Sequence, residues 1–246
     1  MVVLLHAGVA DRRSWHEMAA RFGGRATLVA YDRRGYGESA VSAEPFRHVD
    51  DLLAVLDEVT DRPAWLLGNS RGGGEALDAT LLAPDRVAGL VLLAPAVGGA
   101  PEPELDPVLR EFDRSITAAV DAGDIDEVNR LETWLWLDGP AGPEGRVGGA
   151  PRALALEMNA TILRSGAPEE AGASGIDTWT RLDELQVPVT VACGDRDVGF
   201  LVRRCRELAD RLPRGRHRVL AQMAHLPALE QPQAVAQLLA EAITAE

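Results

Sequence analysis

The sequence predicts an α/β fold, in which a mostly parallel sheet is flanked by helices and carries a helical insertion. Three observations predict it. Short apolar runs alternate with helical patterns along the chain, as in sheets whose strands are joined by helical crossovers. Several runs are apolar almost throughout, which is typical of parallel strands covered on both faces. One long interval, residues 98–186, shows no strand pattern.

The core elements follow one another in a regular order. The expected strands are Val2–Leu5, Thr27–Tyr31, Ala64–Leu67, Val87–Leu93, Val187–Cys193 and Arg218–Leu220. Helical patterns lie between them, near residues 12–22, 46–60, 70–82, 199–212 and 231–244. With 246 residues, the chain is long enough for one domain with a large buried core.

The interval from 98 to 186 predicts a cap of helices over one end of the sheet. Its expected segments are an amphipathic helix over Leu105–Val120, a helix from Asp124 toward Trp134 and Trp136, a glycine- and proline-rich loop over 138–151, and a helix over 152–164. Such an interval is too long for a simple crossover between strands. We therefore divide the chain into a core of residues 1–97 and 187–246 and a helical cap of residues 98–186.

Composition and charge exclude several classes of function. The formal net charge of -13 repels nucleic-acid phosphates and anionic membranes, so we expect a small-molecule substrate and neither nucleic acid nor a membrane as a partner. No apolar run has the length of a membrane span, and the N-terminus lacks the pattern of a signal peptide. Cys193 and Cys205 are expected as free buried thiols, which predicts a cytoplasmic protein.

The sequence contains no pattern that predicts a metal ion or an organic cofactor. Its histidines and cysteines lack the spacing of metal ligands. The glycines at 72–74 match neither a phosphate loop nor a dinucleotide fingerprint. We therefore expect no cofactor, and the alternative role for Cys193 is that of a nucleophilic thiol.

The segment Gly68-Asn69-Ser70-Arg71-Gly72 matches the pattern G-x-S-x-G in a context that predicts a nucleophilic serine. A strand pattern runs into it and a helical pattern runs out of it, as in the strained strand-to-helix turn that lifts a serine hydroxyl above a sheet. The amide of Arg71 then lies at a helix N-terminus, where developing negative charge is favoured. A plain glycine-rich turn is the alternative interpretation.

A nucleophilic serine needs a base, and the base needs an anion to hold its tautomer. Of the five histidines, only His225 lies between the last strand and the final helix, at the edge where open α/β sheets bind ligands. Its alternative is a histidine on a surface loop. Two carboxylates, Asp195 and Asp197, follow the strand that ends at Cys193. We prefer Asp197 as the partner of the base and interpret Asp195 as a turn residue.

Several segments resemble the α/β-hydrolase superfamily, and together they span nearly the whole chain. They are Leu4–Gly8 as the oxyanion loop, Asp32–Ser39 as D-x-R-G-x-G-x-S, Ala83–Val87 as the link into the next strand, Gly194–Asp197 as G-x-x-D, and His225–Pro232 as H-x-x-x-x-E-x-P. The order serine, aspartate, histidine is that of the family's triad. The resemblance implies an oxyanion hole formed by the amides of Gly8 and Arg71. Val9 is the alternative to Gly8, because Ala7 stands where glycine is usual.

The resemblance also implies supporting roles and one departure. His6 is expected to be a structural residue of the oxyanion loop, and Asp32 and Arg34 are expected to brace loops near the site. The family's N-terminal hairpin is missing, since the chain starts at the family's third strand. That leaves strand Thr27–Tyr31 as an open sheet edge, which proteins normally protect. We therefore expect a second copy of the chain, in a homo-oligomer, or the cap to cover it.

Together these features predict a serine hydrolase that cleaves an ester-like bond of a small, neutral, partly apolar substrate through an acyl-enzyme. Triad and fold do not fix the substrate, so a carbon–carbon bond hydrolase or lyase is an alternative. A ligand receptor that retains the triad is another. Trp134 and Trp136 are expected either to line the substrate pocket or to pack within the cap. Arg71 either reaches toward the pocket or faces packing or solvent.

Overall fold

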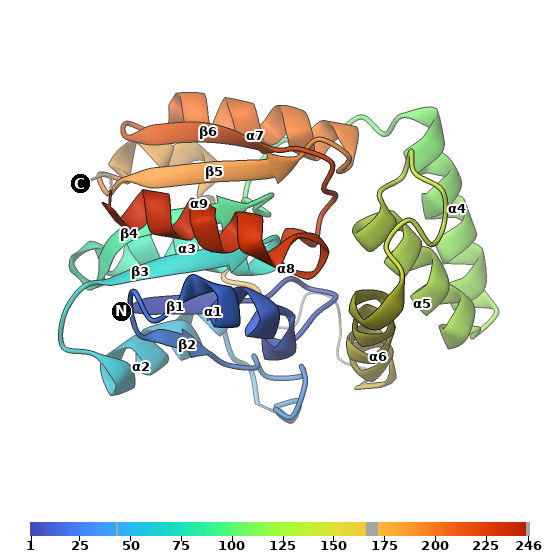
Figure 1. The fold of residues 1–246 in the computed structure, drawn as a ribbon, viewed down its shortest axis with the longest axis horizontal. Helices are drawn as coiled ribbons and strands as arrows, with labels where there is room; N and C mark the ends of the chain where they lie inside the picture. The colour runs from blue at the N-terminus through green and yellow to red at the C-terminus, as the bar shows by residue number, and fades with distance from the viewer. Residues whose placement is uncertain (43, 166–171, 245–246) are drawn as a thin grey trace.

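Six strands form one parallel sheet, which confirms the predicted fold class. The computed structural model describes residues 1–42, 44–165 and 172–244. In spatial order, the strands are β2 (Leu28–Ala30), β1 (Val2–Leu5), β3 (Ala64–Asn69), β4 (Val87–Leu93), β5 (Val189–Gly194) and β6 (Gly215–Leu220). Every neighbouring pair is parallel, so all the carboxyl ends meet at one edge of the sheet (Figure 1).

Helices cover both faces of the sheet, which explains why its strands are apolar on both sides. On one face lie α1 (His16–Phe22) and α9 (Pro232–Thr244), and on the other lie α2 (His48–Val59), α3 (Arg71–Leu82) and α7 (Gly199–Arg211). Short turns complete the core, namely η1 (Arg12–Trp15), η2 (Pro84–Arg86) and α8 (Pro227–Glu230). Val2 and Leu4 pack in the first layer and Val3 and Leu5 in the second, as strand alternation requires. In the described part of the chain, no helix has the length and apolar character needed to cross a membrane.

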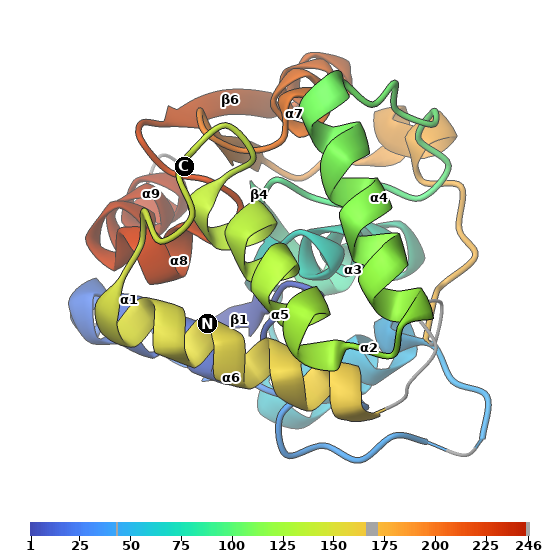
Figure 2. The same cartoon turned by 90° about the vertical axis from the view of Figure 1, so that its right-hand side faces the viewer.

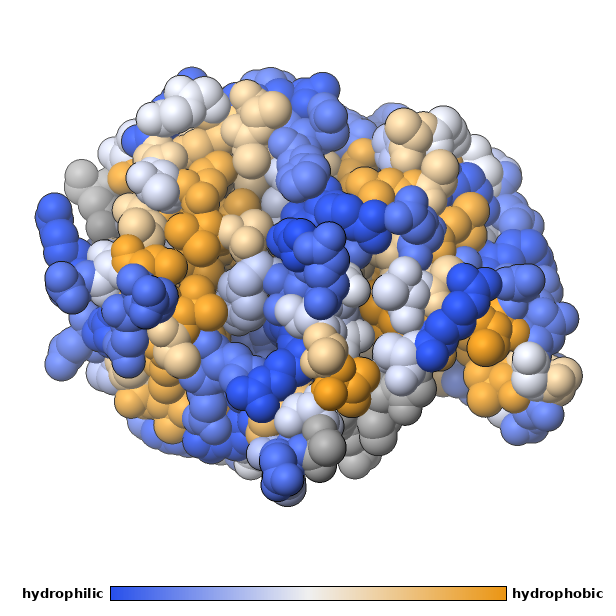
Figure 3. Space-filling model, turned by 90° about the horizontal axis from the view of Figure 1, so that it is seen from below, coloured by the Kyte–Doolittle hydropathy of each residue, from blue (hydrophilic) through white to orange (hydrophobic). Residues whose placement is uncertain are grey.

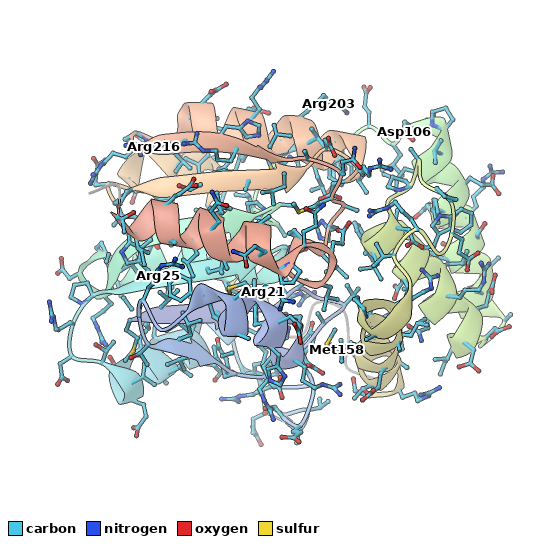
Figure 4. The ribbon with its side chains drawn as sticks, viewed as in Figure 1. Arg21, Arg25, Asp106, Met158, Arg203 and Arg216 are labelled. Atoms are coloured by element: carbon cyan, nitrogen blue, oxygen red, sulfur yellow. The ribbon has the colours of Figure 1, made fainter. Side chains whose placement is uncertain are left out.

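The chain between β4 and β5 folds into helices that lie beyond the carboxyl ends of the strands (Figures 1 and 2). These are α4 (Pro107–Asp121), α5 (Ile125–Thr133), the π-helical turn η3 (Trp134–Asp138), α6 (Gly149–Ser165) and the short η4 (Trp179–Glu184). α5 packs against both α4 and α6. Met158 of α6 lies at the base of this insertion, where its sulfur accepts the N–H of Asp11 at 3.4 Å (Figure 4).

α6 begins earlier than the sequence predicts. It starts at Gly149, whereas the glycine- and proline-rich pattern predicts a loop through Pro151. A proline in the first turn of a helix loses no intrahelical hydrogen bond, because the first N–H groups have no partner there. Pro151 therefore lies inside the start of the helix. The start of α5 agrees with the sequence, since the Asp124 side chain accepts the N–H of Glu127 at 3.0 Å.

The sheet ends in β2, whose outer edge has no strand partner among the described residues. β2 pairs only with β1, and its three residues are half-buried. The lower face of the molecule carries apolar surface that is interrupted by hydrophilic side chains (Figure 3). The insertion lies beyond the strand ends (Figure 1), so coverage of this edge by a second copy of the chain stays a prediction.

A strained turn between β3 and α3 holds Ser70. The residue has a φ of 53° and a ψ of -116°, and a positive φ is costly for a residue with a side chain. Two glycines let the neighbouring backbones approach. A Cβ at Gly68 would lie 2.4 Å from the carbonyl oxygen of Gly72, and a Cβ at Gly72 would lie 2.4 Å from the carbonyl oxygen of Leu5. α3 can therefore begin directly against β1.

We expect Gly72→Ala to destabilise the fold by about 1–3 kcal/mol, the usual cost of forcing an extra methyl group into a packed interior. The added group would meet the backbone of Leu5, which the sheet holds in place. Gly148→Ala is the matched control, because a Cβ there meets nothing within 4 Å. Urea unfolding followed by circular dichroism measures both variants. Equal losses of stability in the two variants would contradict the close approach of α3 to β1.

Candidate active site

The backbone around Ser70 is fixed on both sides by hydrogen bonds. Its N–H donates to the carbonyl oxygen of Leu93 at 2.8 Å, and its own carbonyl oxygen accepts the N–H groups of Gly73, Gly74 and Ala96 at 2.9–3.1 Å. β4 and α3 therefore hold the turn between them. This fixes the position from which the hydroxyl projects into the cavity described below.

Asp197 and His225 form a buried pair on neighbouring loops at the carboxyl edge of the sheet. Asp197 Oδ2 lies 2.9 Å from His225 Nδ1, and the two residues are 6% and 4% exposed. Asp197 also accepts the N–H of Val198 at 2.7 Å and contacts the Cys193 sulfur at 3.6 Å. Because a carboxylate accepts the proton at Nδ1, Nε2 of a neutral ring is left as the acceptor.

Ser70 and His225 line the same cavity, which has a volume of about 470 Å³. The Ser70 hydroxyl makes no hydrogen bond to a described residue, and such contacts often tighten only when substrate is bound. The cavity also contacts Gly8, Val9 and Arg71. Its complete lining is Gly8, Val9, Arg34, Gly35, Tyr36, His48, Ser70, Arg71, Ala96, Glu132, Trp136, Asn159, Ile162, Leu163 and His225.

The structure also places Asp195 and Cys193, the two side chains considered as alternatives for the acid and the nucleophile. The Asp195 carboxylate accepts the N–H of Gln222 at 2.7 Å and so supports the turn that leads to His225. Cys193 and Cys205 are both free and buried. A hydrogen bond with Cys205 and burial raise the pKa of the Cys193 thiol, which disfavours the thiolate that a nucleophilic cysteine needs.

Only one of the two tryptophans lines the cavity. The Trp136 ring lies 4.7 Å from the His225 ring, measured between centroids, and the Trp136 carbonyl oxygen accepts the His225 N–H at 3.1 Å. Trp134 instead packs edge-on against Phe112 and donates its Nε1–H to the carbonyl oxygen of Gly142 at 3.0 Å. Trp134 therefore packs within the insertion, the second of the two roles that the sequence left open.

A buried arginine lies behind the loop that carries Gly8. Arg33 is 1% exposed, donates to the carbonyl oxygen of Ala7 at 2.9 Å, and pairs with the buried Glu75 at 3.0 Å. His6 Nδ1 lies 2.9 Å from the same carbonyl oxygen. Burial and the charge of Arg33 hold the pKa of His6 well below its usual value, so His6 acts there as a neutral ring.

The sequence missed Arg33. Asp32 does brace the loops, since it accepts the N–H groups of Arg12 at 2.8 Å and Glu38 at 3.1 Å. Arg34 lines the cavity and pairs with Asp51. Two adjacent arginines look alike in the sequence. Only the partner 42 residues further along the chain, Glu75, distinguishes the buried one.

In the described residues, no group of three or more histidine, cysteine, aspartate or glutamate side chains is arranged to hold a metal ion. Ser70 and His225 line one cavity, and the Asp197 carboxylate bonds to the imidazole from the core. A parallel sheet with a serine on a strained turn and a buried imidazole–carboxylate pair beside it is characteristic of α/β hydrolases. The chain belongs to the alpha/beta hydrolase family, whose model matches residues 2–238.

Two curated relatives align over nearly the whole chain. The pimeloyl-[acyl-carrier protein] methyl ester esterase of Edwardsiella ictaluri is 29% identical over 98% of this chain and 92% of that protein. The putative 2-succinyl-6-hydroxy-2,4-cyclohexadiene-1-carboxylate synthase of Bacillus subtilis is 24% identical over 99% of this chain and 90% of that protein. Some other matches are shorter: the alignment with the uncharacterized hydrolase YraK of Bacillus subtilis, 34% identical, spans 35% of this chain and 34% of that protein.

The comparison with solved structures agrees with the fold. Est816, described as an N-acyl homoserine lactone degrading enzyme, is 25% identical and superposes with a TM-score of 0.76 over 97% of this chain and 91% of that chain. The family match and these neighbours support a hydrolase.

We expect Arg33→Met to destabilise the protein by about 3–5 kcal/mol, because it leaves the carboxylate of Glu75 buried without its cation. Burial already raises the pKa of Glu75. A buried acid that stays protonated to higher pH in the native state than in the unfolded chain loses stability as pH rises. The loss should therefore grow from pH 5 to pH 8, as measured by urea unfolding.

The double variant Arg33→Met/Glu75→Leu is the control for this prediction. It replaces both charges by apolar groups, so most of the lost stability should return. A double variant as unstable as Arg33→Met alone would show that the arginine stabilises the loop by packing and not by its charge.

Proposed function

We propose that the chain is a serine hydrolase in which Ser70 is the nucleophile, His225 the general base and Asp197 the carboxylate that orients the base. The bond cleaved is ester-like, in a small, neutral and partly apolar substrate. One observation supports the proposal most directly. His225, whose Nδ1 forms a buried hydrogen bond with Asp197 Oδ2, lines the same cavity as Ser70.

The proposed reaction has two steps. Ser70 Oγ attacks the carbonyl carbon while His225 Nε2 takes the hydroxyl proton, and the imidazolium then protonates the departing alkoxide. An acyl-enzyme and an alcohol result. In the second step His225 takes a proton from water, the hydroxide attacks the acyl carbon, and the proton returns to Ser70 Oγ as the acid leaves.

The negative charge of the tetrahedral intermediate requires donors close to Ser70. We assign them to the backbone amides of Arg71 and Gly8, with Val9 as the alternative to Gly8. Arg71 is the first residue of α3, so its amide points out of a helix N-terminus, where an anion is favoured. Both Gly8 and Val9 line the cavity, which is compatible with either assignment.

We further propose that residues 98–186 act as a cap that selects the substrate. The insertion contributes Trp136, Ile162 and Leu163 to the cavity wall as apolar groups, and Glu132 and Asn159 as polar ones. A wall of this kind suits a substrate that is apolar in part and is oriented by a few polar contacts. The relatives support an acyl substrate, since one is named a methyl ester esterase and another degrades an acyl lactone.

A lyase is the second candidate, because a relative aligned over nearly the whole chain is named a putative synthase. In that case His225 would act as a base on the substrate itself, and no acyl group would remain on Ser70. Mass spectrometry after rapid acid quenching separates the two proposals. An adduct of the acyl mass on the peptide that contains Ser70 supports the hydrolase.

We expect Ser70→Ala to lower kcat/KM for p-nitrophenyl butyrate by at least about 10⁴-fold, because the acyl-enzyme can no longer form. Melting temperature and circular dichroism should stay near those of the wild type. Ser115→Ala, on the outer helix α4, is the control and should keep full activity. Turnover by Ser70→Ala at the wild-type rate would exclude the proposed nucleophile.

A further inference from the structure

One contact ties the insertion to the loop that carries His225. It joins Arg146, in the segment between η3 and α6, to Glu230 at the end of α8. The Arg146 side chain is 17% exposed and that of Glu230 only 2%. We propose that Arg146 is a positioning residue, which fixes the proposed base through Glu230 and makes the geometry of the site depend on a docked insertion. This inference rests on the proposed function.

Arg146 holds two segments at once. Towards the insertion, its Nε donates to the carbonyl oxygen of Asp138 at 2.6 Å and its Nη2 to that of Leu137 at 2.8 Å. Towards the core, its Nη1 donates to the carbonyl oxygen of Gln222 at 3.2 Å, and its Nη2 also contacts the Glu230 carboxylate. The planar guanidinium can serve these acceptors together because its N–H groups point in fixed directions.

Glu230 transmits the contact to the base. Its second oxygen accepts the N–H of Ala224 at 2.8 Å, and Ala224 directly precedes His225. The His225 N–H donates to the Trp136 carbonyl oxygen, which is next in the chain to the carbonyl group of Leu137 that Arg146 holds. The N–H groups of Ala224 and His225 are thus both linked to the Arg146 guanidinium. Ala224 is linked through Glu230, and His225 is linked through η3.

The remaining hydrogen bonds of His225 come from the core. Asn69 Nδ2 donates to the His225 carbonyl oxygen at 3.1 Å, and Asp197 accepts from the ring. These contacts hold the imidazole and the carbonyl group that follows it. They do not hold the N–H groups of Ala224 and His225, whose acceptors are Glu230 and Trp136. A displacement of about 1 Å at a catalytic group can lower the rate by as much as 10²-fold.

The contact also depends on pH. Burial raises the pKa of Glu230 to about 7, and Asp197 adds to the rise while Arg146 and the Ala224 amide oppose it. Above pH 7 the carboxylate is ionised and its attraction to Arg146 is complete. Below pH 7 it gains a proton and the attraction weakens. Acidification should therefore loosen the loop.

The experiment compares Arg146→Gln with Arg130→Gln. Arg130 also lies in the insertion and pairs with Glu127 and Glu144, but it forms no hydrogen bond or ion pair with a described residue of the core. We expect Arg146→Gln to lower kcat for p-nitrophenyl butyrate by about 10- to 100-fold, with a smaller change in KM. The pH of half-maximal kcat should rise, because Glu230 loses the cation that keeps it ionised. Arg146→Lys should restore part of both.

A second readout needs no turnover. Amide hydrogen exchange at residues 222–226 should be faster in Arg146→Gln than in the wild type, and unchanged in Arg130→Gln. Glu230→Gln, which keeps an acceptor for Ala224 but cannot titrate, should show a pH profile that no longer responds to a further Arg146→Gln change. If Arg146→Gln does not fold, the pH profile of Glu230→Gln alone still tests the inference.

Two results would overturn the inference. The first is that Arg146→Gln and Arg130→Gln have the same kcat, the same pH profile of kcat and the same amide exchange. The second is that the pH profile of kcat of Glu230→Gln is identical to that of the wild type. The exchange result separates this inference from the proposed function. If Ser70→Ala keeps full turnover, the proposed function fails, yet faster exchange in Arg146→Gln would still establish that the insertion holds this loop.

Discussion

The hydrogen bond between Asp197 and His225 is the interaction on which the arrangement of the site depends. The Asp197 side chain is fully buried, and a buried carboxylate must have its charge satisfied by donors. Asp197 obtains them from the imidazole and from the Val198 amide. The two residues come from different loops, so the bond depends on the placement of the loops after β5 and β6. The insertion adds the acceptor of the His225 N–H. A correctly oriented imidazole therefore requires that this edge of the sheet is correctly folded.

Two buried ion pairs stand on either side of this bond. Arg33 and Glu75 lie behind the loop of Gly8, and Arg146 and Glu230 lie beside the loop of His225. In both pairs burial raises the pKa of the carboxylate, which means that desolvation outweighs the attraction of the arginine. Such pairs add little net stability compared with apolar side chains. Their arginines donate to backbone carbonyl groups, so their contribution is to orient loops.

The sequence predicts the core well because local patterns and short motifs encode it. Apolar runs locate five of the strands, whereas β6 begins at Gly215, three residues before the expected Arg218, because its first half is polar. The turn after β3 and the loop after β6 locate Ser70 and His225. What the sequence cannot provide is the outcome of distant contacts. Trp134 and Trp136 are the same residue type in the same helical turn, η3. Only the packing of η3 decides which of the two rings contacts the imidazole. The partner of Arg146 lies 84 residues further along the chain, beyond the reach of any local pattern.

The insertion contacts both loops that carry the central bond, and this limits how it can vary. Gly139 ends η3 with a φ of 86°, and a Cβ there would lie 2.3 Å from the carbonyl oxygen of Arg196, next to Asp197. Trp136, three residues earlier, accepts the His225 N–H. A change of substrate is accommodated most directly at side chains of α5 and α6 that line the cavity, namely Glu132, Ile162 and Leu163. The stretch from Trp136 to Gly139 contacts the backbone of both loops, so a change in its path would disturb the segments that carry the acid and the base.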